Sequence, residues 1–447
     1  MIFPPQGLAQ KHQALNIYSP CPPKWGPAIK HHLNSRRLEY YLTILKDVVS
    51  QIKPDKLSPY SQVKPRNKVP ILREGFGVFS YLCTHFMSAL KFYPLKVKDV
   101  RPETADCVSV SLEVPGELSE VFRFAPGQYL TFRRHFNNDE IRRSYSICTS
   151  PKDGELRVAI KKVDEGKFST YAHGTLKAGE ILEVMPPMGN FIIKNTEKKS
   201  KEYLAFAAGS GITPIMSILK SVLEDEPDSN FTLIYGNRSK NSIIFRETIE
   251  ALKNKYMLRF RVYHVLSREY MEIPLFSGRI DAEKCAEFCK TLIDVNSIDE
   301  AFICGPEEMI LSVRQKLIEL GMPSGNVHIE LFTSPGQPKT NHEKWVTKHK
   351  EKGPKSKVSI TLDGVTFDME VGFNDESILD AALKNGADLP YACKGGVCCT
   401  CRAKVIEGEV EMEVNYALEH DEVAKGYILT CQSHPRTERV VIDFDAR

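Results

Sequence analysis

Four cysteines near the C-terminus have a spacing that suits an iron–sulfur cluster. Cys393, Cys398 and Cys401 follow the pattern C-x4-C-x2-C, and Cys431 lies thirty residues further along the chain. This is a ligand spacing of [2Fe–2S] clusters, and thiolates are the soft ligands that such clusters use. The glycine pair at residues 395–396 can adopt positive φ angles and bring backbone N–H groups close to the sulfurs. We therefore predict these four cysteines as the ligands of one [2Fe–2S] cluster.

A zinc site or unpaired core cysteines are the alternatives at this loop. Structural zinc sites usually present two C-x2-C pairs or a mixture of Cys and His, and a four-residue gap followed by a single distant cysteine fits that pattern poorly. Cys399 is adjacent to Cys398 and cannot easily point at the same pair of irons. We predict that Cys399 is a small buried residue and not a ligand.

A second segment whose side chains could bind a cofactor is Arg142-Arg143-Ser144-Tyr145-Ser146. An arginine fork such as Arg143 offers bidentate hydrogen-bond donors to a pyrophosphate. The ring of Tyr145 can lie flat on an isoalloxazine, and the hydroxyl of Ser146 can reach the reactive nitrogen of that ring. These types in this order indicate a flavin site. The alternative is an ordinary β-barrel with a pair of surface arginines.

A glycine-rich turn indicates a nucleotide site further along. An apolar run at residues 203–208 leads into Gly209-Ser-Gly211-Ile-Thr213-Pro214 and then into an apolar-periodic helix. At such a junction, backbone N–H groups and the helix dipole can hold a pyrophosphate. Arg238 follows the next predicted strand, where an adenosine 2′-phosphate would lie, whereas NAD-preferring sites usually carry an acid there. NADPH is therefore favoured over NADH, and Arg246 could assist.

The patterns around these segments predict a multidomain chain. Short alternating strands separated by Pro-Gly and Asp-Gly turns predict an antiparallel β-barrel over residues 93–197. Strands alternate with helices over residues 198–335, which is typical of an α/β doubly wound parallel sheet. A Pro-, Lys- and His-rich linker at residues 336–356 precedes an α+β domain of β-grasp type at residues 357–447, which contains a hairpin, a short helix near residues 377–384 and the cluster loop.

The composition is that of an ordinary globular protein, with 42% apolar and 26% charged residues in 447 and a formal net charge of +3. No run of eighteen apolar residues predicts a membrane span, and nothing indicates nucleic-acid binding. The cysteines lack the rhythm of a secreted scaffold, which favours the cytoplasm. Residues 1–92 contain ten prolines and 13 basic against 4 acidic residues. We interpret them as an extension of unknown role, with one amphipathic helix between residues 38 and 49.

The flavin segment and the later Gly166-Lys167-Phe168-Ser169-Thr170 together resemble the paired flavin motifs of the ferredoxin–NADP⁺ reductase family. The resemblance implies that Gly166, Lys167, Ser169 and Thr170 form the motif that donates backbone N–H and hydroxyl groups to the diphosphate. Cys304-Gly305-Pro306 resembles the nicotinamide motif of the family, whose thiol lies near the hydride-donating carbon. The resemblance also implies that Phe332 lies near the flavin ring and yields to the nicotinamide, and it favours FAD over FMN.

The order of barrel, nucleotide domain and C-terminal ferredoxin over residues 93–447 is similar to that of the fused flavin reductases that serve oxygenases, and in its motifs most of all to the reductase subunits of aromatic-ring epoxidases. This resemblance implies an NADPH-dependent oxidoreductase that passes electrons through FAD and a [2Fe–2S] cluster to an oxygenase partner. NADPH gives two electrons at once and a cluster accepts one, so a flavin must stand between them. Ser146 and Cys304 would then lie at the position of hydride transfer.

Two other functions remain open from the sequence. A related group of reductases with the same domain order uses FMN and NADH to reduce Rieske dioxygenases, and a hydroxylase or desaturase could also be the acceptor. A non-enzymatic alternative is a redox-sensing interaction module, in which the cluster senses electrons and does not relay them.

Overall fold

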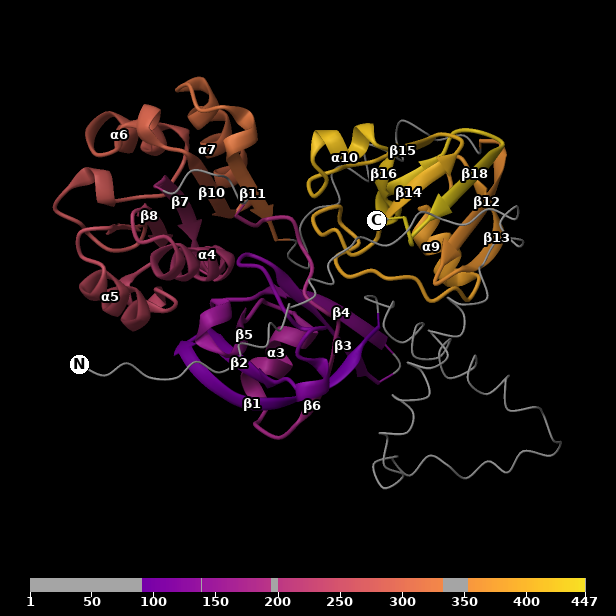
Figure 1. The fold of residues 1–447 in the computed structure, drawn as a ribbon, viewed down its shortest axis with the longest axis horizontal. Coiled ribbons are helices and arrows are strands. Elements are labelled where there is room, and N and C mark those ends of the chain that lie inside the picture. The colour runs from indigo at the N-terminus through magenta and orange to yellow at the C-terminus, as the bar shows by residue number, and fades with distance from the viewer. Residues whose placement is uncertain (1–90, 138, 194–199, 333–352, 447) are drawn as a thin grey trace, which may run out of the picture. The chain divides into compact units, whose positions relative to one another are not determined.

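The computed structural model describes residues 91–137, 139–193, 200–332 and 353–446, and Figure 1 shows the fold. The predicted N-terminal extension with its helix, and most of the predicted linker, lie outside these residues. In the described part of the chain, no helix combines the length and the apolar character that a membrane crossing requires.

The first sheet is antiparallel and six-stranded, with the order β4-β3-β6-β1-β2-β5. Strand β1 alternates between buried and exposed positions, with Leu95 and Val97 buried between exposed neighbours, whereas β2 and β5 are buried along almost their whole length. A bridge between Ile147, which follows β4, and Val158 of β5 joins the two edges of the sheet, so the sheet closes into a barrel. The elements are β1 (Tyr93–Thr104), β2 (Cys107–Glu113), β3 (Tyr129–Phe136), β4 (Asp139–Ser146), β5 (Leu156–Lys161), α3 (Lys167–Gly174) and β6 (Ile181–Val184).

The second sheet is parallel and five-stranded, with the order β11-β10-β7-β8-β9. Its central strand is a continuous apolar run that is buried on both faces, as expected when helices cover both sides. Figure 1 shows α4 and α5 on one face and α6 and α7 on the other, in agreement with the two apolar clusters that these pairs form with the sheet. The elements are β7 (Glu202–Ala208), α4 (Ile212–Asp225), β8 (Asn230–Asn237), α5 (Arg246–Lys255), β9 (Phe260–Leu266), α6 (Ala282–Thr291), β10 (Glu300–Gly305), α7 (Glu307–Glu319) and β11 (Val327–Leu331).

The third sheet is mixed, with the order β13-β12-β18-β14-β16, and a two-stranded sheet of β15 and β17 accompanies it. Helix α9 packs its buried residues, among them Ile378 and Leu379, into the core of this part, and the hydroxyl of Ser377 accepts a hydrogen bond from the N–H of Asp380 at its start. The elements are β12 (Lys355–Leu362), β13 (Val365–Gly372), α9 (Ile378–Lys384), β14 (Arg402–Glu407), β15 (Val410–Met412), α10 (His420–Ala424), β16 (Tyr427–Leu429), β17 (Ser433–Pro435) and β18 (Arg439–Asp443).

The predicted fold class is confirmed in all three parts. The apolar pattern of the sequence predicts helices over residues 246–255 and 215–223. Helix α5 has the predicted bounds, whereas α4 extends beyond residues 215–223 at both ends. The apolar period that predicted α4 begins only after its first turn, which the glycine-rich segment forms. The strand β4, which carries the flavin segment, was not predicted as a strand because arginines and serines interrupt its apolar alternation. The domain limits given above stay predictions.

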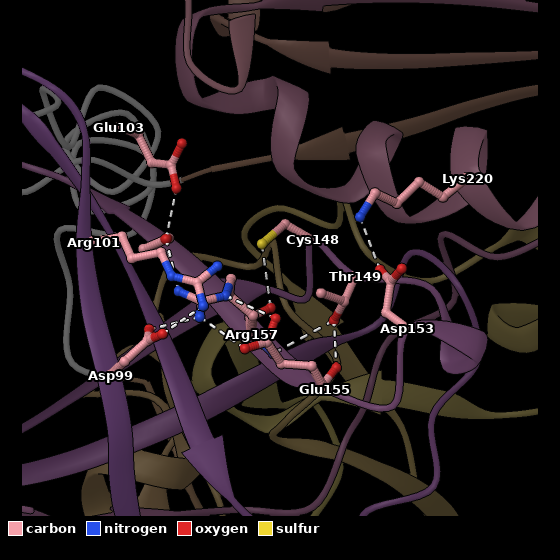
Figure 2. A network of polar contacts seen from close by, with 10 residues as sticks. Asp99, Arg101, Glu103, Cys148, Thr149, Asp153, Glu155, Arg157 and Lys220 are labelled. Atoms are coloured by element: carbon pink, nitrogen blue, oxygen red, sulfur yellow. Dashed lines mark hydrogen bonds and ion pairs between the residues drawn. The ribbon is translucent and has the colours of Figure 1, made fainter. Parts of the chain in front are cut away.

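A buried arginine holds the strands of the barrel together. The guanidinium of Arg157 donates hydrogen bonds to Asp99 at 2.6 Å, to Glu155 at 2.7 Å and to the hydroxyl of Ser109 at 2.9 Å. Figure 2 shows Asp99 of β1 and Glu155, which directly precedes β5, around the guanidinium of Arg157. The side chain of Arg157 is only 5% exposed, and its hydrogen bonds lower the pKa of Glu155 to about 2. The charge is therefore satisfied by partners on separate strands, on the face of the sheet opposite the apolar core of the barrel.

The turn after β4 connects the barrel to α4. The hydroxyl of Ser217 on α4 donates to the backbone oxygen of Thr149 at 2.6 Å, and Lys220 pairs with Asp153 at 2.8 Å. Figure 2 shows Lys220 reaching this turn from the helix. Because the first turn of α4 adjoins the glycine-rich segment, these contacts hold the predicted nucleotide turn in register with the barrel.

We expect the substitution Arg157→Leu to lower the free energy of unfolding of the barrel by roughly 3 kcal/mol, because the partly buried Glu155 would lose its partner and Asp99 would keep only the exposed Arg101. Arg101 pairs with the same Asp99 at 2.6 Å but is 60% exposed, so Arg101→Leu should cost about 0–1 kcal/mol. The measurement is the urea midpoint for release of bound flavin. Equal shifts in the two variants would contradict this role of Arg157.

Candidate flavin, nucleotide and iron–sulfur sites

The predicted cluster ligands lie together in the third part of the chain. Cys393, Cys398 and Cys401 occupy an irregular loop between α9 and β14, and Cys431 occupies a single 3-10 turn directly after β16. Cys393 is half-buried, and the other three are at most 5% exposed. Cys399 is also buried, and its thiol donates to the backbone oxygen of Ala417 at 3.3 Å. The loop thus brings the four predicted ligands together from two separate segments.

The backbone of the loop wraps around the first ligand. Positive φ angles occur at Lys394 (+50°) and Gly396 (+73°), and not at Gly395, which the sequence reasoning included. The N–H of Gly395 donates to the sulfur of Cys393 at 3.3 Å, so this glycine contributes through its bare backbone. A Cβ atom on Gly396 would lie 2.9 Å from the side chain of Val414. Glycine at 396 is therefore required by both conformation and space.

The four sulfurs interact with one another as groups sharing one site. The Cys393 thiolate accepts hydrogen bonds from Cys398 and Cys431, which hold its pKa well below the usual value, and the same contacts raise the pKa values of the two donors. Among the described residues, no three His, Cys, Asp or Glu side chains converge on the position of a single metal ion. A [2Fe–2S] cluster divides its four thiolates between two irons, so a single-ion geometry is not what its ligands require. The donor set fits the cluster.

A cavity of about 180 Å³ lies between the end of β4, strand β11 and the cluster loop. Its walls come from all three parts of the chain. The lining residues with chemical roles in the predictions are Arg143, Ser146, Phe332, Cys393 and Cys398, together with Tyr129 and Glu330. The structure therefore brings residues of the predicted flavin segment and two predicted cluster ligands to one cavity.

Ser146 has a partner that the sequence reasoning missed. Its hydroxyl donates to Glu330 at 3.1 Å, and Glu330 pairs in register with Cys304 across β10 and β11. Burial raises the pKa of Glu330 to about 8, although the hydrogen bond from Ser146 lowers it in part. Glu330 is therefore largely protonated at neutral pH and can hold a proton beside the predicted flavin site. The sequence carried one signal for it, an acid two residues before Phe332.

The side chains of the two arginines in the flavin segment point to opposite faces of β4. Arg143 lines the cavity, where its guanidinium is available to an anion. Arg142 is buried and donates to the backbone oxygen of Leu389 at 3.2 Å and to Asp388 at 3.3 Å, while its guanidinium lies 4.1 Å from the ring centre of Tyr391. Arg142 thus contacts the third part of the chain and not a phosphate. Alternation along β4 places consecutive side chains on opposite faces, which accounts for the separation.

Tyr145 and the second flavin motif lie side by side. The half-buried ring of Tyr145 is 5.7 Å from the ring of Phe168, in the first turn of α3. Ser169 is buried, donates to the oxygen of Gly166 at 3.2 Å and accepts from Val163, so it orders the turn. No side chain caps the start of α3, so its first N–H groups can bind a phosphate.

The remaining residues of the second motif lie around that start. Lys167 pairs with Asp139 at 2.6 Å, and the N–H of Thr170 donates to Gly166 within the helix. The contacts of Gly166, Lys167, Ser169 and Thr170 with a diphosphate, and the stacking of Tyr145 on a flavin, stay predictions.

A larger cavity of about 870 Å³ lies at the carboxyl ends of β7, β8, β9 and β10, the edge where parallel α/β sheets bind ligands. Gly209, Arg238, Gly305 and Pro306 line it. The neighbouring Gly211, Thr213 and Pro214 are buried at the junction with α4 and support the turn from behind. A Cβ on Gly211 would lie 2.1 Å from the backbone oxygen of Cys304, so glycine is needed there for close packing.

Several cations line this cavity. Arg238 follows β8, Arg268 follows β9, and Lys161 reaches in from the end of β5, near Gly209. Sequence reasoning found Arg238 but missed Arg268 and Lys161, because only the fold brings the ends of β5 and β9 to this edge. Arg246, considered as an assistant, instead pairs with Glu250 at 2.9 Å and is not part of the lining.

Phe332 lines both cavities. It directly follows β11 and is half-buried, so its ring stands where the two spaces meet. Cys304 is fully buried between them, and burial raises the pKa of its thiol. Such a thiol stays neutral and can act by contact and not as a nucleophile. The roles of Phe332 and Cys304 at a nicotinamide stay predictions.

Comparison with protein-family models gives three matches along the chain. An oxidoreductase FAD-binding domain matches residues 94–193, an oxidoreductase NAD-binding domain matches residues 206–315, and a 2Fe-2S iron-sulfur cluster binding domain matches residues 360–436. The cysteine loop lies within the third match, and the cavity linings lie within the three matches except for Glu330, Leu331 and Phe332, which lie between the second and the third.

The chain is 46% identical over 356 residues to one of the subunits of 1,2-phenylacetyl-CoA epoxidase from Escherichia coli (strain K12), in a match that covers 80% of this chain and 98% of that relative. It is 35% identical over 353 residues to the ferredoxin reductase component of 3-ketosteroid-9-alpha-monooxygenase from Rhodococcus rhodochrous. That match covers 78% of this chain and 96% of the relative. An intact type IV self-sufficient cytochrome P450 monooxygenase shares the fold, with a TM-score of 0.57 and 20% identity. That match covers 78% of this chain, which spans about two fifths (41%) of the cytochrome P450 chain.

These matches define a class of protein. The chain belongs to the family of oxidoreductases that join an FAD-binding, an NAD-binding and a 2Fe-2S domain and that serve as the electron-transfer reductase components of oxygenase systems. Within that family it is similar to the phenylacetyl-CoA epoxidase protein over nearly the whole length of that relative. The resemblance predicted from the motifs is confirmed.

Glu330 provides a prediction about pH. Its folded-state pKa of about 8 lies above the ordinary glutamate value, so the folded protein binds a proton that the unfolded chain has released, and stability must fall as the pH rises from about 5 to 9. Glu330→Gln should flatten this decline. The measurement is the thermal unfolding midpoint of both proteins across that range. Glu319→Gln is the control, because Glu319 is exposed and its pKa is lowered. An unchanged slope in Glu330→Gln would contradict the assignment.

Proposed function

We propose that this chain oxidises NADPH and delivers the electrons singly to an oxygenase of the phenylacetyl-CoA epoxidase type. One observation carries the proposal: the same cavity is lined by Ser146 of the flavin segment and by Cys393 and Cys398 of the cluster loop. When bound there, the flavin supplies the step between hydride transfer and one-electron transfer. The redox-sensing alternative does not require a cavity that joins the two sites.

The cations of the larger cavity support NADPH over NADH. Arg238 and Arg268 follow adjacent parallel strands, and the backbone N–H of Arg268 donates to the oxygen of Arg238 at 2.8 Å. The two guanidiniums therefore begin from neighbouring backbone positions, with Ser242 and Ser267 in the same wall. Two forked cations and two hydroxyls suit a phosphate monoester, whereas an adenosine 2′-OH would leave the charges unpaired. Lys161 can serve the pyrophosphate near Gly209.

The residues at the smaller cavity would orient the reacting groups for hydride transfer, and Ser146 among them is shielded from water. Ser146 is buried and is held by Glu330, so its hydroxyl has a defined direction. The protonated Glu330 can exchange a proton with Ser146. Phe332 lines both cavities, so we propose that its ring moves aside when the nicotinamide enters. We also propose that the fully buried Cys304 supports the nicotinamide.

A short polar path leads from the cavity to the cluster ligands. The hydroxyls of Tyr129 and Thr400 lie 3.0 Å apart and are both buried, and Thr400 also hydrogen-bonds the sulfur of Cys398. Tyr129 packs with Ala392 and Cys398 in one apolar cluster. These contacts fix the distance between the barrel and the cluster loop, which one-electron transfer requires to be short. Arg142 adds a second attachment through Asp388 and Leu389.

The acceptor is proposed from the relatives. The relative that shares 46% identity with this chain is part of phenylacetyl-CoA epoxidase, so an epoxidase oxygenase in phenylacetate catabolism is the partner that we propose. A reductase of a Rieske dioxygenase, hydroxylase or desaturase that uses FMN and NADH is the alternative, and the match to an FAD-binding domain disfavours it. We propose a cytoplasmic location, where free thiols and reduced nucleotides persist.

Removing the two arginines should weaken NADPH binding selectively. We expect Arg238→Ala and Arg268→Ala each to raise KM for NADPH by about 10- to 100-fold, which corresponds to roughly 1.5–3 kcal/mol for a lost charge-assisted contact. Steady-state reduction of ferricyanide by each variant is measured with NADPH and with NADH. The NADH values serve as the control and should change little. Equal losses with both nucleotides would refute recognition of the 2′-phosphate.

Separating the two redox centres tests the function itself. We expect Cys401→Ser to lose the cluster absorbance, to keep flavin binding and flavin reduction by NADPH, and to lose product formation with a purified phenylacetyl-CoA epoxidase oxygenase. Cys399→Ser is the matched control and should keep all of these. NADPH oxidation without epoxide formation by the wild-type pair would refute the proposed partner. Failure of the wild-type protein to oxidise NADPH with both cofactors bound would refute the reductase.

A further inference from the structure

Gln432 lies next to the fourth predicted ligand and is unusual in its position. It is a buried amide, 7% exposed, at the end of the 3-10 turn that carries Cys431. Its Nε2 atom lies 2.9 Å from the backbone oxygen of Cys431, 3.1 Å from that of Lys394 and 3.7 Å from the sulfur of Cys431. Lys394 directly follows the first predicted ligand, Cys393. One side chain therefore contacts both ends of the ligand set.

The packing around Gln432 keeps its amide in this position. Its Cγ atom would lie 3.2 Å from a Cβ on Gly396, so the stem of the side chain rests against the bare glycine. On the other side, the N–H of Glu413 donates to the backbone oxygen of Gln432 at 2.8 Å. An amide held by packing on its stem and by backbone bonds points its N–H groups at fixed acceptors. The amide has two N–H donors for three acceptors, so one N–H is directed at the oxygen of Lys394 and the other is shared between the backbone oxygen and the sulfur of Cys431.

We propose that the side-chain amide of Gln432 sets the reduction potential of the iron–sulfur cluster by donating a hydrogen bond to the Cys431 thiolate, while its bond to Lys394 holds that loop on the cluster. Adding one electron makes the cluster and its thiolates more negative by one charge, with no proton taken up. A fixed N–H donor stabilises the more negative state more strongly and so raises the potential. This inference rests on the ligand set in the proposed function.

The burial of Cys431 and the donors to the neighbouring sulfurs explain why Gln432 matters for the reduction potential. Cys431 is only 5% exposed, so water contributes little to stabilising added charge at its sulfur. The sulfur of Cys393 has its own donor, the N–H of Gly395, and that of Cys398 has the hydroxyl of Thr400. These two donors are a backbone amide and a hydroxyl. Gln432 supplies the corresponding donor for Cys431 from its side-chain amide. A single substitution of Gln432 can therefore change the reduction potential.

The test compares Gln432→Met with Gln315→Met in the full-length protein. Methionine keeps the length of the side chain and removes the donor. Gln315 is the matched control, because its exposed amide donates to Glu319 on α7, outside the cluster domain. Redox titration followed by electron paramagnetic resonance should show a lower cluster reduction potential in Gln432→Met. The equilibrium constant for electron transfer from the flavin to the cluster should fall threefold to tenfold, where tenfold is about 59 mV for one electron. The control should match the wild type.

A second measurement does not depend on the stability of the variant. Wild-type protein labelled with ¹⁵N only at glutamine side-chain amides should show a hyperfine coupling between the reduced cluster and one ¹⁵N nucleus. Absence of that coupling, or an unshifted potential in a cluster-loaded Gln432→Met, would overturn the inference while the proposed function stands. If Gln432→Met binds no cluster, the wild-type coupling alone decides. Wild-type protein without a [2Fe–2S] signal would overturn both.

Discussion

The structure depends on a constraint set by electron counting. A nucleotide that gives electrons in pairs and a cluster that takes them singly can cooperate only when a flavin site adjoins both. In the proposed function, the flavin site that meets this constraint is one small cavity to which the barrel, strand β11 and the cluster loop each contribute. The hydrogen bond between Tyr129 and Thr400, at 3.0 Å, joins the barrel to the loop beside that cavity. The remainder of the fold holds these elements in place.

Polar groups inside the protein do much of this positioning. Arg157 joins three strands of the barrel, and Arg142 extends from the barrel to Leu389 and Asp388. A buried guanidinium is costly unless its donors are satisfied, so each such residue selects one arrangement of its partners over slipped alternatives. Apolar contacts alone would tolerate small shifts of strand or loop. Electron transfer between two redox centres does not tolerate such shifts. This is a reason for the buried charges in this protein.

In the proposed function, the two cavities have separate roles. Cations such as Arg238 and Arg268 line the larger cavity, where they would bind the phosphates of the nucleotide away from the reacting groups. The smaller space has a neutral, largely buried pair, Ser146 and Glu330, beside neutral Cys304. Phe332 is the residue common to both linings. In this proposal, one aromatic ring therefore lies between the site of nucleotide binding and the site of hydride transfer.

Local chemistry allowed much of the site to be predicted. The spacing of Cys393, Cys398, Cys401 and Cys431 is itself a ligand geometry, because a loop of that length can wrap only a small centre. The alternation of strands and helices over residues 198–335 similarly implies a parallel sheet with its ligand edge at the carboxyl ends. Arg238 could be found because it follows a strand, and Ser146 because it stands in a compact motif.

The sequence by itself therefore determined the cofactor classes and the fold class of each part, because these depend on residues close together in the chain, and the same local pattern predicts the ligand cysteines. Only the tertiary structure decided which partners meet from distant segments: Glu330 with Ser146, Arg268 with Arg238, Arg142 with Asp388, and Gln432 with the loop of Cys393. No spacing or periodicity encodes such pairs. They arise when separate strands and loops pack into one core, and burial then sets the charge and direction of the groups they bring together.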